Sequence, residues 1–465
     1  MWGLKYLLLC AWTAAAAWYP AKGEAIVDGR RPKRLYDEGD SMYIGGGTLR
    51  KRDSPGAVNA YCRYWGHSSA LVGEKVYMTG GIATFKENFR NNWIYLYYAA
   101  IMADLSGGVQ FPVDANNSIF AYIVMGDDGE GTQQGAFWWD GGNYIWKYGG
   151  WFANDKTWTD TPQARVRHSD MWRLDLSRST WENKSIDPAN IHRAWGGATV
   201  SVPEKQLGYF LGGIVENRTD TAYADAPGYL VLKDSFLNYD SGTNVFANRT
   251  APKLGHTALG NMVYISGMGQ DGLLVYLGGA EGPSGWVPTG TTEGMQLRDL
   301  GTVWVYDIQN TRWYSQKTSG QTPPGRISAC SVVVPSQDNS SWNIFMHGGG
   351  TLGETSGDVY GDTWVLSLPT FQWVQVDTKG DKKFEHTCHV VKGNQLLVIG
   401  GRDKQQEFSG DPANDYSVDA SDWSCLKRGI FSSLNLNTFE WEDSLPIDDD
   451  TFEVNKLIVG KIGGK

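Results

Sequence analysis

The chain is poor in the residues that metal chemistry and nucleic-acid binding need. It has only seven histidines in 465 residues, which limits the number of metal ligands. It also lacks a basic cluster in its body and carries a net charge of -10, so nothing attracts a phosphate backbone. We therefore expect no cofactor and no nucleic-acid partner.

Long hydrophobic runs are also missing after residue 25. The most apolar later segment, Trp93–Ala103, has about half of the roughly 20 residues that a membrane span requires. Residues 1–25 carry Lys5, an apolar run and small residues suited to cleavage, which is typical of a secretory signal peptide. A membrane anchor is the alternative, but the run is short for one. The sequence predicts a secreted monomer, free or associated with a cell wall, with no membrane span in the mature chain.

Cysteine is scarce, and its number fits secretion. Five cysteines are present, and removal of Cys10 with the signal peptide leaves an even set of four. Cys388 and Cys425 are closest in sequence, so we favour a disulfide between them, with Cys62 and Cys330 as the remaining pair. Four buried thiols are the alternative. Five glycosylation triplets agree with the same compartment and begin at Asn116, Asn183, Asn217, Asn248 and Asn339.

Proline is infrequent, whereas glycine and aromatic residues are abundant. The chain has 17 Pro and 58 Gly, and 13% of its residues are aromatic. This balance favours aromatic-rich strands joined by glycine turns. Because 465 residues are too many for one ordinary core, several domains or a repeat architecture must account for the length.

A diglycine that ends an apolar run recurs six times. The six pairs begin at Gly80, Gly149, Gly212, Gly278, Gly348 and Gly400. A residue without Cβ lets the end of each strand approach its neighbours closely. The recurrence predicts six copies of one structural unit.

A polar residue lies six positions before an aromatic residue in five of these units. The pairs are Asp175 with Trp181, Asp240 with Phe246, Asp307 with Trp313, Ser367 with Trp373, and Asn435 with Trp441. Asp, Asn and Ser close turns with their side chains, which predicts a hairpin. The aromatic ring then lies on the return strand, where it fills the space between stacked sheets. Asp175 is therefore interpreted as part of the scaffold.

Each unit also contains a strand that begins with small residues, as in GHSSALV from Gly66 to Val72. Small side chains suit strands that converge on a narrow axis. Four strands repeated six times predict an all-β, six-bladed propeller of four-stranded antiparallel blades. The predicted organisation is a signal peptide at 1–25, an amino-terminal segment at 26–59 and a propeller at 60–464.

The diglycine after an apolar strand and the spaced Trp resemble the kelch-repeat family, and more closely its secreted or cell-surface fungal members. The resemblance covers roughly residues 60 to 463 and implies a kelch β-propeller. A propeller of this kind is closed by a strand from one terminus. Either Ser41–Gly47 or Phe452–Gly464 supplies that strand.

Two groups of polar residues are candidates for an axial or metal site. His67, His256 and His386 are interpreted as occupying one repeat position near the axis, either as a partial ring or as hydrogen-bonding partners between blades. Glu354, Asp358 and Asp362 recur every four residues in a loop. Their carboxylates suit a hard cation, but solvated loop acids are the favoured interpretation, so no metal is expected.

The loops that follow the diglycines carry aromatic residues. They are Trp151, Phe152, Trp158, Trp286 and Trp423. Aromatic rings in polar loops are typical of binding surfaces, and packing between neighbouring loops is the alternative. We therefore expect a non-catalytic binding module for a protein or glycan. The alternatives are an enzyme or accessory protein that handles a small metabolite at the axis, by analogy with fungal secondary metabolism, and a structural cell-wall glycoprotein.

Overall fold

The structure is a computed structural model that describes residues 50–51, 61–85, 93–95, 99–113, 119–125, 131–152, 170–185, 191–288, 293–353, 357–377, 380–403 and 428–463. Strands dominate these residues, and the one α-helix among them is α1 (Lys456–Ile462). The all-β prediction is confirmed.

Six sheets follow one another along the described part of the chain, and each contains four antiparallel strands paired in sequence order. Further strands extend three of them: β1 (Arg50–Lys51) the first, β29 (Ser319–Gly320) the fifth, and β2 (Tyr61–Trp65), β5 (Ile82–Phe85) and β6 (Trp93–Tyr95) the sixth. The first three sheets, from the innermost strand outward, are β3 (Ser68–Val72), β4 (Lys75–Thr79), β7 (Ala99–Asp104) and β9 (Phe120–Val124); β11 (Ala136–Trp139), β12 (Tyr144–Tyr148), β14 (Asp170–Asp175) and β15 (Thr180–Ser185); and β16 (Ala198–Val202), β17 (Leu207–Leu211), β20 (Ser235–Asp240) and β21 (Val245–Thr250).

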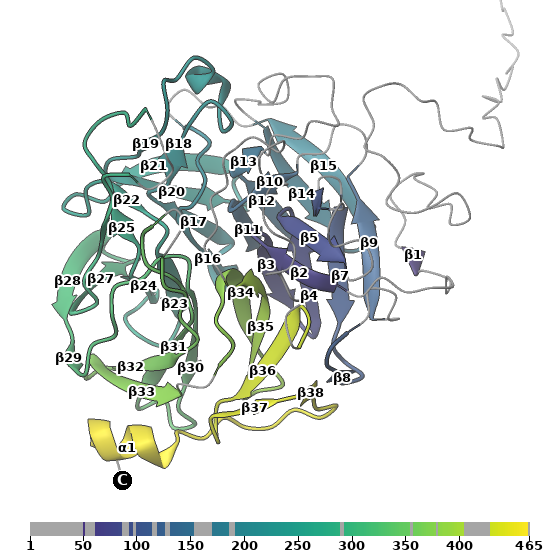
Figure 1. The fold of residues 1–465 in the computed structure, drawn as a ribbon, viewed down its shortest axis with the longest axis vertical. Helices are drawn as coiled ribbons and strands as arrows, with labels where there is room; N and C mark the ends of the chain where they lie inside the picture. Colours follow the sequence, from purple (N-terminus) through teal and green to yellow (C-terminus); the bar gives the residue numbers. More distant parts are fainter. Residues whose placement is uncertain are drawn as a thin grey trace, which may run out of the picture.

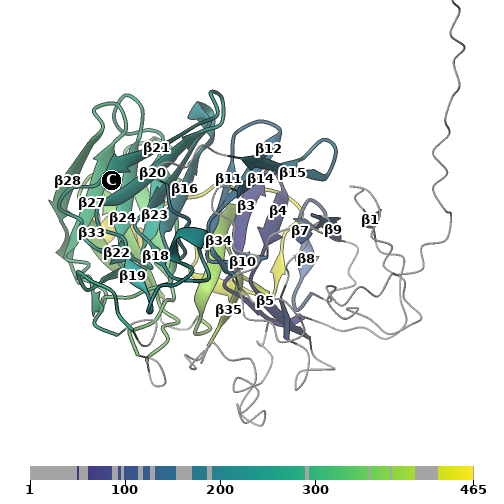
Figure 2. The same cartoon turned by 90° about the horizontal axis from the view of Figure 1, so that it is seen from above.

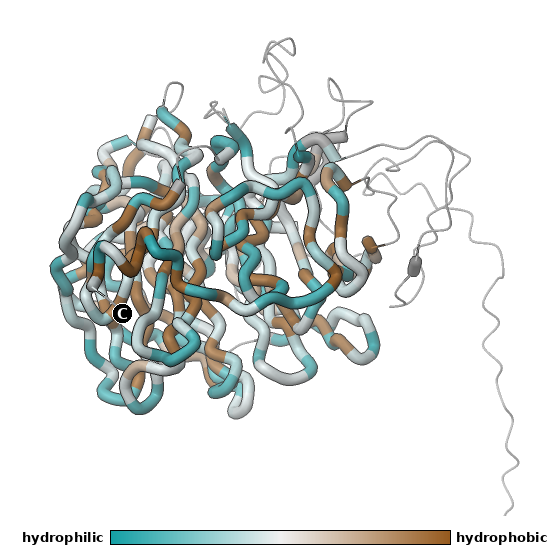
Figure 3. Tube along the Cα trace, turned by 90° about the horizontal axis from the view of Figure 1, so that it is seen from below, coloured by the Kyte–Doolittle hydropathy of each residue, from teal (hydrophilic) through white to brown (hydrophobic). Residues whose placement is uncertain are grey.

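The other three sheets are β23 (Asn261–Ile265), β24 (Leu273–Leu277), β27 (Thr302–Asp307) and β28 (Arg312–Lys317); β30 (Cys330–Pro335), β31 (Trp342–His347), β32 (Thr363–Leu368) and β33 (Gln372–Asp377); and β34 (Phe384–Val391), β35 (Gln395–Arg402), β36 (Phe431–Asn435) and β37 (Glu440–Glu442). Figure 1 shows the innermost strands around the middle and the outermost strands at the rim. Figure 2 shows the sheets standing side by side. In Figure 3 apolar residues are frequent in the interior of the molecule, and many of the outer bends are hydrophilic.

The predicted hairpins form, although Ser367 does not close its turn through its side chain, because its buried Oγ has no hydrogen-bond partner among the described residues. The Oδ1 atom of Asp175 accepts hydrogen bonds from the backbone N–H groups of Ser177 and Arg178, at 3.0 and 3.1 Å. Asp240 and Asn435 close equivalent turns through their own side-chain oxygens. These residues are therefore turn formers of the scaffold.

The spaced aromatic residue of each hairpin packs against the preceding sheet. Trp181 donates from Nε1 to the carbonyl of Ile123, at 3.2 Å, and Trp373 does the same to Leu300, at 3.1 Å. The Trp441 ring lies 5.0 Å from the His347 ring. The aromatic rings thus fill the space between successive sheets, as predicted.

The diglycines contact the backbone of the next repeat. Both residues of Gly212-Gly213 have positive φ, 68° and 105°, and the N–H of Gly213 donates to the carbonyl of Thr257 at 2.8 Å. A Cβ at Gly212 would lie 2.0 Å from that same oxygen. Glycine is required there for both its conformation and the close approach.

We expect Gly212→Ala to lower the free energy of unfolding by about 3 kcal/mol, because the new methyl group adds a backbone clash to the cost of a left-handed conformation. Gly73→Ala is the matched control, since Gly73 has φ of 58° but a Cβ there would meet nothing within 4 Å. Its cost is expected to be about 1 kcal/mol. Urea unfolding of both variants measures the difference, and equal losses would contradict the close-contact explanation.

Six residues around the middle form a closed cycle of backbone hydrogen bonds, which we call the axial ring. Each N–H donates to the carbonyl of the member from the preceding repeat: Gln134 to Gly66 (2.9 Å), Gly196 to Gln134 (2.9 Å), Leu259 to Gly196 (2.6 Å), Ser328 to Leu259 (2.9 Å), Glu385 to Ser328 (3.1 Å) and Gly66 to Glu385 (3.0 Å). All six have φ between 50° and 66°. The cycle returns to its first member.

The innermost strands contact one another in the same order. Each contacts the next, and β34 of the sixth sheet contacts β3 of the first. A second link joins these two repeats, because β2 (Tyr61–Trp65) pairs with β35 through Tyr64 and Gly401. The first and last repeats are therefore neighbours.

The termini do not supply the predicted closing strand within the described residues. The segment Phe452–Gly464 was expected as a strand, but its described part contains α1, which contacts β33. Asn455 caps this helix by accepting from the N–H of Leu457, at 2.9 Å. The other option, Ser41–Gly47, lies outside the described residues, whereas β1 (Arg50–Lys51) pairs with the rim strand β9.

Candidate functional site

The joint between the last and the first sheet, which we call the closing joint, is polar. Ser69 donates from Oγ to the Thr387 Oγ1 at 2.6 Å. His67 and His389 extend this pair at its two ends. The His67 Nε2 lies 2.9 Å from the Thr387 Oγ1, and the His389 Nε2 lies 2.7 Å from the Ser69 Oγ. Three hydrogen bonds therefore form one chain that runs from His67 through Thr387 and Ser69 to His389.

The direction of the Ser69–Thr387 hydrogen bond indicates how protons are placed along this chain of hydrogen bonds. The two hydroxyl groups supply two protons, so one imidazole proton completes the chain. Because Ser69 donates to Thr387, His389 donates to Ser69 and Thr387 donates to His67. In this arrangement His389 carries a proton on Nε2 and His67 accepts at Nε2.

Burial of the closing joint agrees with this protonation state. Burial lowers the pKa of His67 to about 3, with His386 and His389 adding to the effect. Burial also lowers the pKa of His389 to about 4. The His67 ring stacks on Tyr64 at a centroid distance of 4.2 Å. The closing joint thus holds two neutral imidazoles.

A second buried cluster contains His347, Lys383 and His386. The His347 and His386 rings are 5.6 Å apart, and Lys383 donates from Nζ to the Ser432 Oγ at 2.9 Å. Burial lowers the pKa of His347 to about 3 and that of Lys383 to about 8. All three side chains are buried. Their burial favours a role in packing between sheets.

The predicted equivalence of His67, His256 and His386 is wrong for His256. His67 and His386 each follow directly after an axial-ring residue. His256 instead precedes its axial-ring residue, Leu259, by three positions. Its Nδ1 donates to the carbonyl of Val231, at 2.8 Å. His256 is therefore part of a loop contact.

The acidic triplet does not assemble a cation site in the described residues. Asp362 pairs with the buried guanidinium of Arg326 at 2.7 Å and accepts from the Trp364 Nε1 at 2.6 Å. Asp358 is exposed, and Glu354 lies outside the described residues. In the described part of the chain, no group of three or more His, Cys, Asp or Glu residues is placed to hold a metal ion. Asp362 is thus a structural acid.

The cysteine pairing differs from the prediction. The structure joins Cys330 to Cys388, so Cys388–Cys425 and Cys62–Cys330 are not the pairs. Cys330 begins β30 and Cys388 lies in β34, so the disulfide links the innermost strands of two successive sheets. Sequence distance was a poor guide because strand register decides which residues meet.

The glycosylation triplets occupy several environments. Asn183 on β15 and Asn248 on β21 are exposed, and so is Asn339 in the turn before β31. Asn217 is half-buried, whereas Asn116 lies outside the described residues. Asn183 and Asn248 hold equivalent places, each two residues after the spaced aromatic residue on an outermost strand.

The segments that follow the diglycines start at the same end of the sheets as the axial ring, and we call this end the loop face. The third and fourth of these segments are joined by two backbone hydrogen bonds between Tyr229 and Val287, at 3.0 and 2.9 Å. We call residues 212–234 and 278–288 the joined loops.

The joined loops carry an aromatic surface. Trp286 is 38% exposed, and its ring lies 5.7 Å from that of Tyr223. Tyr223 in turn lies 5.1 Å from the His192 ring. The sequence prediction included Trp286 but missed Tyr223 and His192. Tyr223 carried the same signal, an aromatic residue within the polar loop segment TAYADAPG.

The other predicted loop aromatics differ in exposure. Trp151 is half-buried against Trp195, and the Arg218 guanidinium lies 4.5 Å above its ring. Phe152 is buried, so its prediction as an exposed contact residue is wrong. Trp158 and Trp423 lie outside the described residues. Among the predicted aromatic residues that are described, Trp286 is the most exposed.

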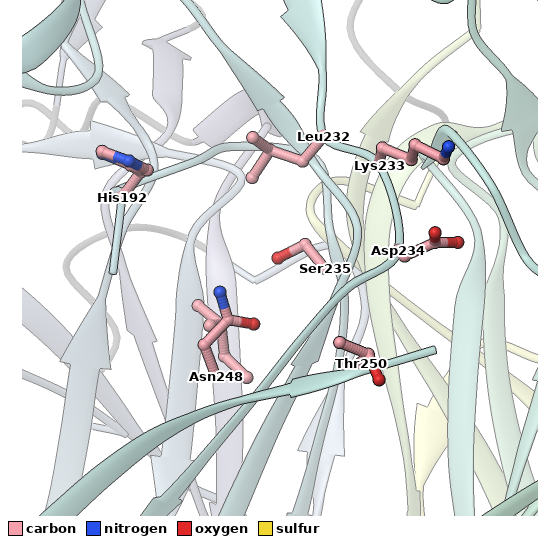
Figure 4. A pocket seen from close by; sticks show the side chains of 8 residues that line it. His192, Leu232, Lys233, Asp234, Ser235, Asn248 and Thr250 are labelled. Atoms are coloured by element: carbon pink, nitrogen blue, oxygen red, sulfur yellow. The ribbon is translucent and has the colours of Figure 1, made fainter. Parts of the chain in front are cut away.

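Two hollows lie beside the joined loops. One, of about 290 Å³, contains Arg298, Asp299 and Trp304 at the base of the fourth loop. The other, of about 160 Å³, lies between His192, Leu232, Ser235 and the rim residue Asn248 (Figure 4). Both are small compared with drug-sized ligand pockets of roughly 300–1,000 Å³.

Comparison with known proteins confirms the resemblance to kelch-repeat proteins. A kelch repeat-containing protein of Arthroderma benhamiae is 25% identical over 464 residues, which cover 90% of this chain and 65% of that protein. Host cell factor of Drosophila melanogaster is 27% identical over 209 residues, or 44% of this chain and 12% of that protein. The chain therefore matches only part of each relative. No protein-family model matches it.

The fold has a counterpart among solved structures. YjhT, a kelch propeller, is similar with a TM-score of 0.52 and 12% sequence identity, covering 83% of this chain and 98% of that one. This similarity supports the fold alone. Among the described residues, no helix is both long and apolar enough to cross a membrane.

Proposed function

We propose that the chain is a secreted, six-bladed kelch propeller that binds a protein partner through its loop face without catalysing a reaction. Two contacts between the last and the first repeat support closure of six blades. Glu385 accepts from Gly66 in the axial ring, and Tyr64 pairs with Gly401. Through the second contact, β2 of the first repeat joins the sheet of the last repeat.

The aromatic surface of the joined loops is the observation that carries the binding proposal. Trp286 remains exposed although Tyr223 packs against it, and two backbone hydrogen bonds hold its loop to the neighbouring loop. Large aromatic rings on an ordered support contribute contact area at low entropic cost. Kelch-repeat proteins generally mediate protein interactions, which supports a protein partner.

Secretion is the second part of the proposal. The signal-like segment 1–25 supports it, although this segment lies outside the described residues. The Cys330–Cys388 disulfide suits an oxidising compartment. Amino-terminal sequencing of protein recovered from the culture medium of the native cells tests this part, and we expect a chain without residues 1–25. A protein that stays in the cells and keeps residues 1–25 would contradict it.

Trp286→Ala is expected to weaken partner binding at least 10-fold, because a central exposed Trp commonly contributes more than about 1.4 kcal/mol to an interface. Tyr314→Ala is the matched control, since Tyr314 is 48% exposed but lies on the rim strand β28. Proximity labelling in native cells identifies proteins that depend on Trp286, and calorimetry with the purified partner measures the dissociation constants.

The two variants separate a loop-face partner from other outcomes. Loss of binding in Trp286→Ala but not in Tyr314→Ala supports the proposal. Equal affinity of both variants for the purified partner would refute binding through the joined loops. Selective binding of oligosaccharides by the wild-type chain, lost in Trp286→Ala, would replace the protein partner by a glycan.

A further inference from the structure

We propose that Asn248 carries an N-linked glycan and that the first sugar of this glycan lies in the hollow beside it. The inference rests on the secretory route included in the proposed function. Asn248-Arg249-Thr250 is an acceptor triplet, in which the oligosaccharide is attached to the Asn side chain. The structure adds the accessibility of the acceptor and a place for the sugar.

The acceptor and its hydroxyl residue are both accessible. Asn248 and Thr250 are exposed residues of β21, the outermost strand of the third sheet. Residues two apart on a strand lie on the same side, and both line the same hollow. The triplet therefore presents its two required side chains together at the rim.

The hollow has a suitable size and chemistry for one sugar ring. Its volume is about 160 Å³, and Leu232 and Leu237 give it an apolar part. Ser235 and the half-exposed His192 place polar atoms at its edges. Figure 4 shows the amide of Asn248 directed into the space between His192 and Ser235. An N-acetylhexosamine has the same combination, with apolar C–H groups and an acetyl methyl beside polar hydroxyls.

Asn183 provides a comparison within the same chain. It occupies the equivalent position on β15, is exposed and begins a triplet of its own. It does not line this hollow. A glycan on Asn183 would therefore lack the proposed seat, even though its attachment point is equally accessible.

The test uses the full chain secreted from yeast, which supplies the compartment whether or not the native chain is secreted. Glycopeptide mass spectrometry of the wild type is expected to find sugar on Asn248. Thr250→Ser should keep that modification and Thr250→Ala should abolish it, because the triplet requires a hydroxyl. An unmodified Asn248 peptide in the secreted wild type would overturn the proposal.

Enzymatic trimming tests the seat of the first sugar. Endoglycosidase H leaves one N-acetylglucosamine on Asn, whereas peptide N-glycosidase F removes the whole glycan and leaves Asp at the acceptor position. With the other four acceptors changed to Gln as background (Asn116, Asn183, Asn217 and Asn339), we expect the endoglycosidase-treated protein to keep its melting temperature and the fully deglycosylated protein to lose about 2 °C. The Thr250→Ala protein, which keeps Asn at position 248, should show the same loss, so a loss confined to the enzyme-treated protein would be due to its new Asp. Equal melting temperatures of all three forms would refute the seat.

Failure of this proposal can be distinguished from failure of the proposed function. The sugar is measured on Asn248 and by melting temperature, whereas loop-face binding is measured with Trp286→Ala. Absence of sugar on Asn248 in yeast leaves the binding result unaffected. Retention of residues 1–25 in native cells contradicts native secretion but leaves the acceptor measurement intact.

Discussion

Acidification from pH 8 to pH 5 is expected to reduce the free energy of unfolding by roughly 6 kcal/mol through His67, His347 and His389. Burial lowers the pKa values of the three to about 3, 3 and 4 in the folded chain. The folded chain therefore binds fewer protons than the unfolded chain below pH 6.5. Each histidine contributes about 1.4 kcal/mol per pH unit in that range.

The direction of this effect follows from the depressed pKa values. The stabilisation is complete above the unfolded value of about 6.5 and is lost progressively as the pH falls towards the folded values. At the closing joint, protonation of His67 or His389 would place a charge in a buried chain of hydrogen bonds. Acid is therefore expected to open the ring between its first and last sheets.

Chemical unfolding at pH 8, 7, 6 and 5 measures the dependence. His389→Gln removes one titrating group while keeping an amide donor near Ser69, so its slope below pH 6.5 should be smaller by about 1.4 kcal/mol per pH unit. His192→Gln is the control, because the His192 side chain is 40% exposed. Equal stability of the wild type at pH 8 and pH 5 would contradict the prediction.

A cross-link between Ser69→Cys and Thr387→Cys is expected to form spontaneously and to raise the free energy of unfolding by about 3 kcal/mol. Residues 69 and 387 are 318 positions apart, and a cross-link across such a loop is worth roughly 6 kcal/mol in the chain-entropy account. Three hydrogen bonds are lost in the exchange, at about 1 kcal/mol each.

The native disulfide shows that this pair of positions suits a cross-link. Cys330 lies two residues after its axial-ring residue, and Cys388 lies three residues after the next one. Thr387 and Ser69 have the same offsets at the closing joint, where their oxygens are 2.6 Å apart. The engineered bridge would thus repeat at the sixth joint what the chain already has at the fifth.

Non-reducing peptide mapping identifies the new bridge, and unfolding with and without reductant measures its effect. The comparison protein carries Ser68→Cys with Thr387→Cys, because Ser68 bonds instead towards Gly135 of the second repeat. We expect no bridge in that variant. A stable, folded Ser69→Cys, Thr387→Cys protein in which both introduced thiols remain reduced under air would show that the closing joint is not formed as described.

The repeat scaffold was predictable because its signals are local. The six-residue interval from Asp175 to Trp181 encodes a turn and a ring on the return strand, and both are confirmed. The diglycines were predictable for a similar reason. Gly212 and Gly213 adopt left-handed conformations and approach the next backbone, which no other residue does at low cost.

Features that depend on register between distant strands were not predictable. His67 and His256 both follow a Gly in the sequence, but they differ in position relative to the axial ring. His67 lies one residue after its ring member, whereas His256 lies three residues before its own. Cys388 was assigned to Cys425 by sequence distance, whereas Cys330 is its partner across a joint. Single residues from different repeats meet only through the assembled ring.

The carboxyl-terminal helix was missed because its apolar residues were interpreted as a strand. Asn455 caps the helix, and Ile458 is its buried residue. At the loop face, Trp286 was predicted but its partner Tyr223 was not. An aromatic residue in a loop is visible in the sequence, whereas the neighbour that supports it is not.

The axial ring gives each of the six joints between repeats the same backbone hydrogen bond. Every member both donates and accepts once, so the cycle has no first or last hydrogen bond. Five of the six hydrogen bonds join repeats that follow one another in the sequence, and the sixth, from Gly66 to Glu385, joins the first repeat to the last. In a circularly permuted chain, the last repeat would be linked to the first and the chain would begin between two other repeats. Such a chain would form the same six hydrogen bonds. The order of the repeats around the ring, and not the point at which the chain is opened, is what this architecture preserves.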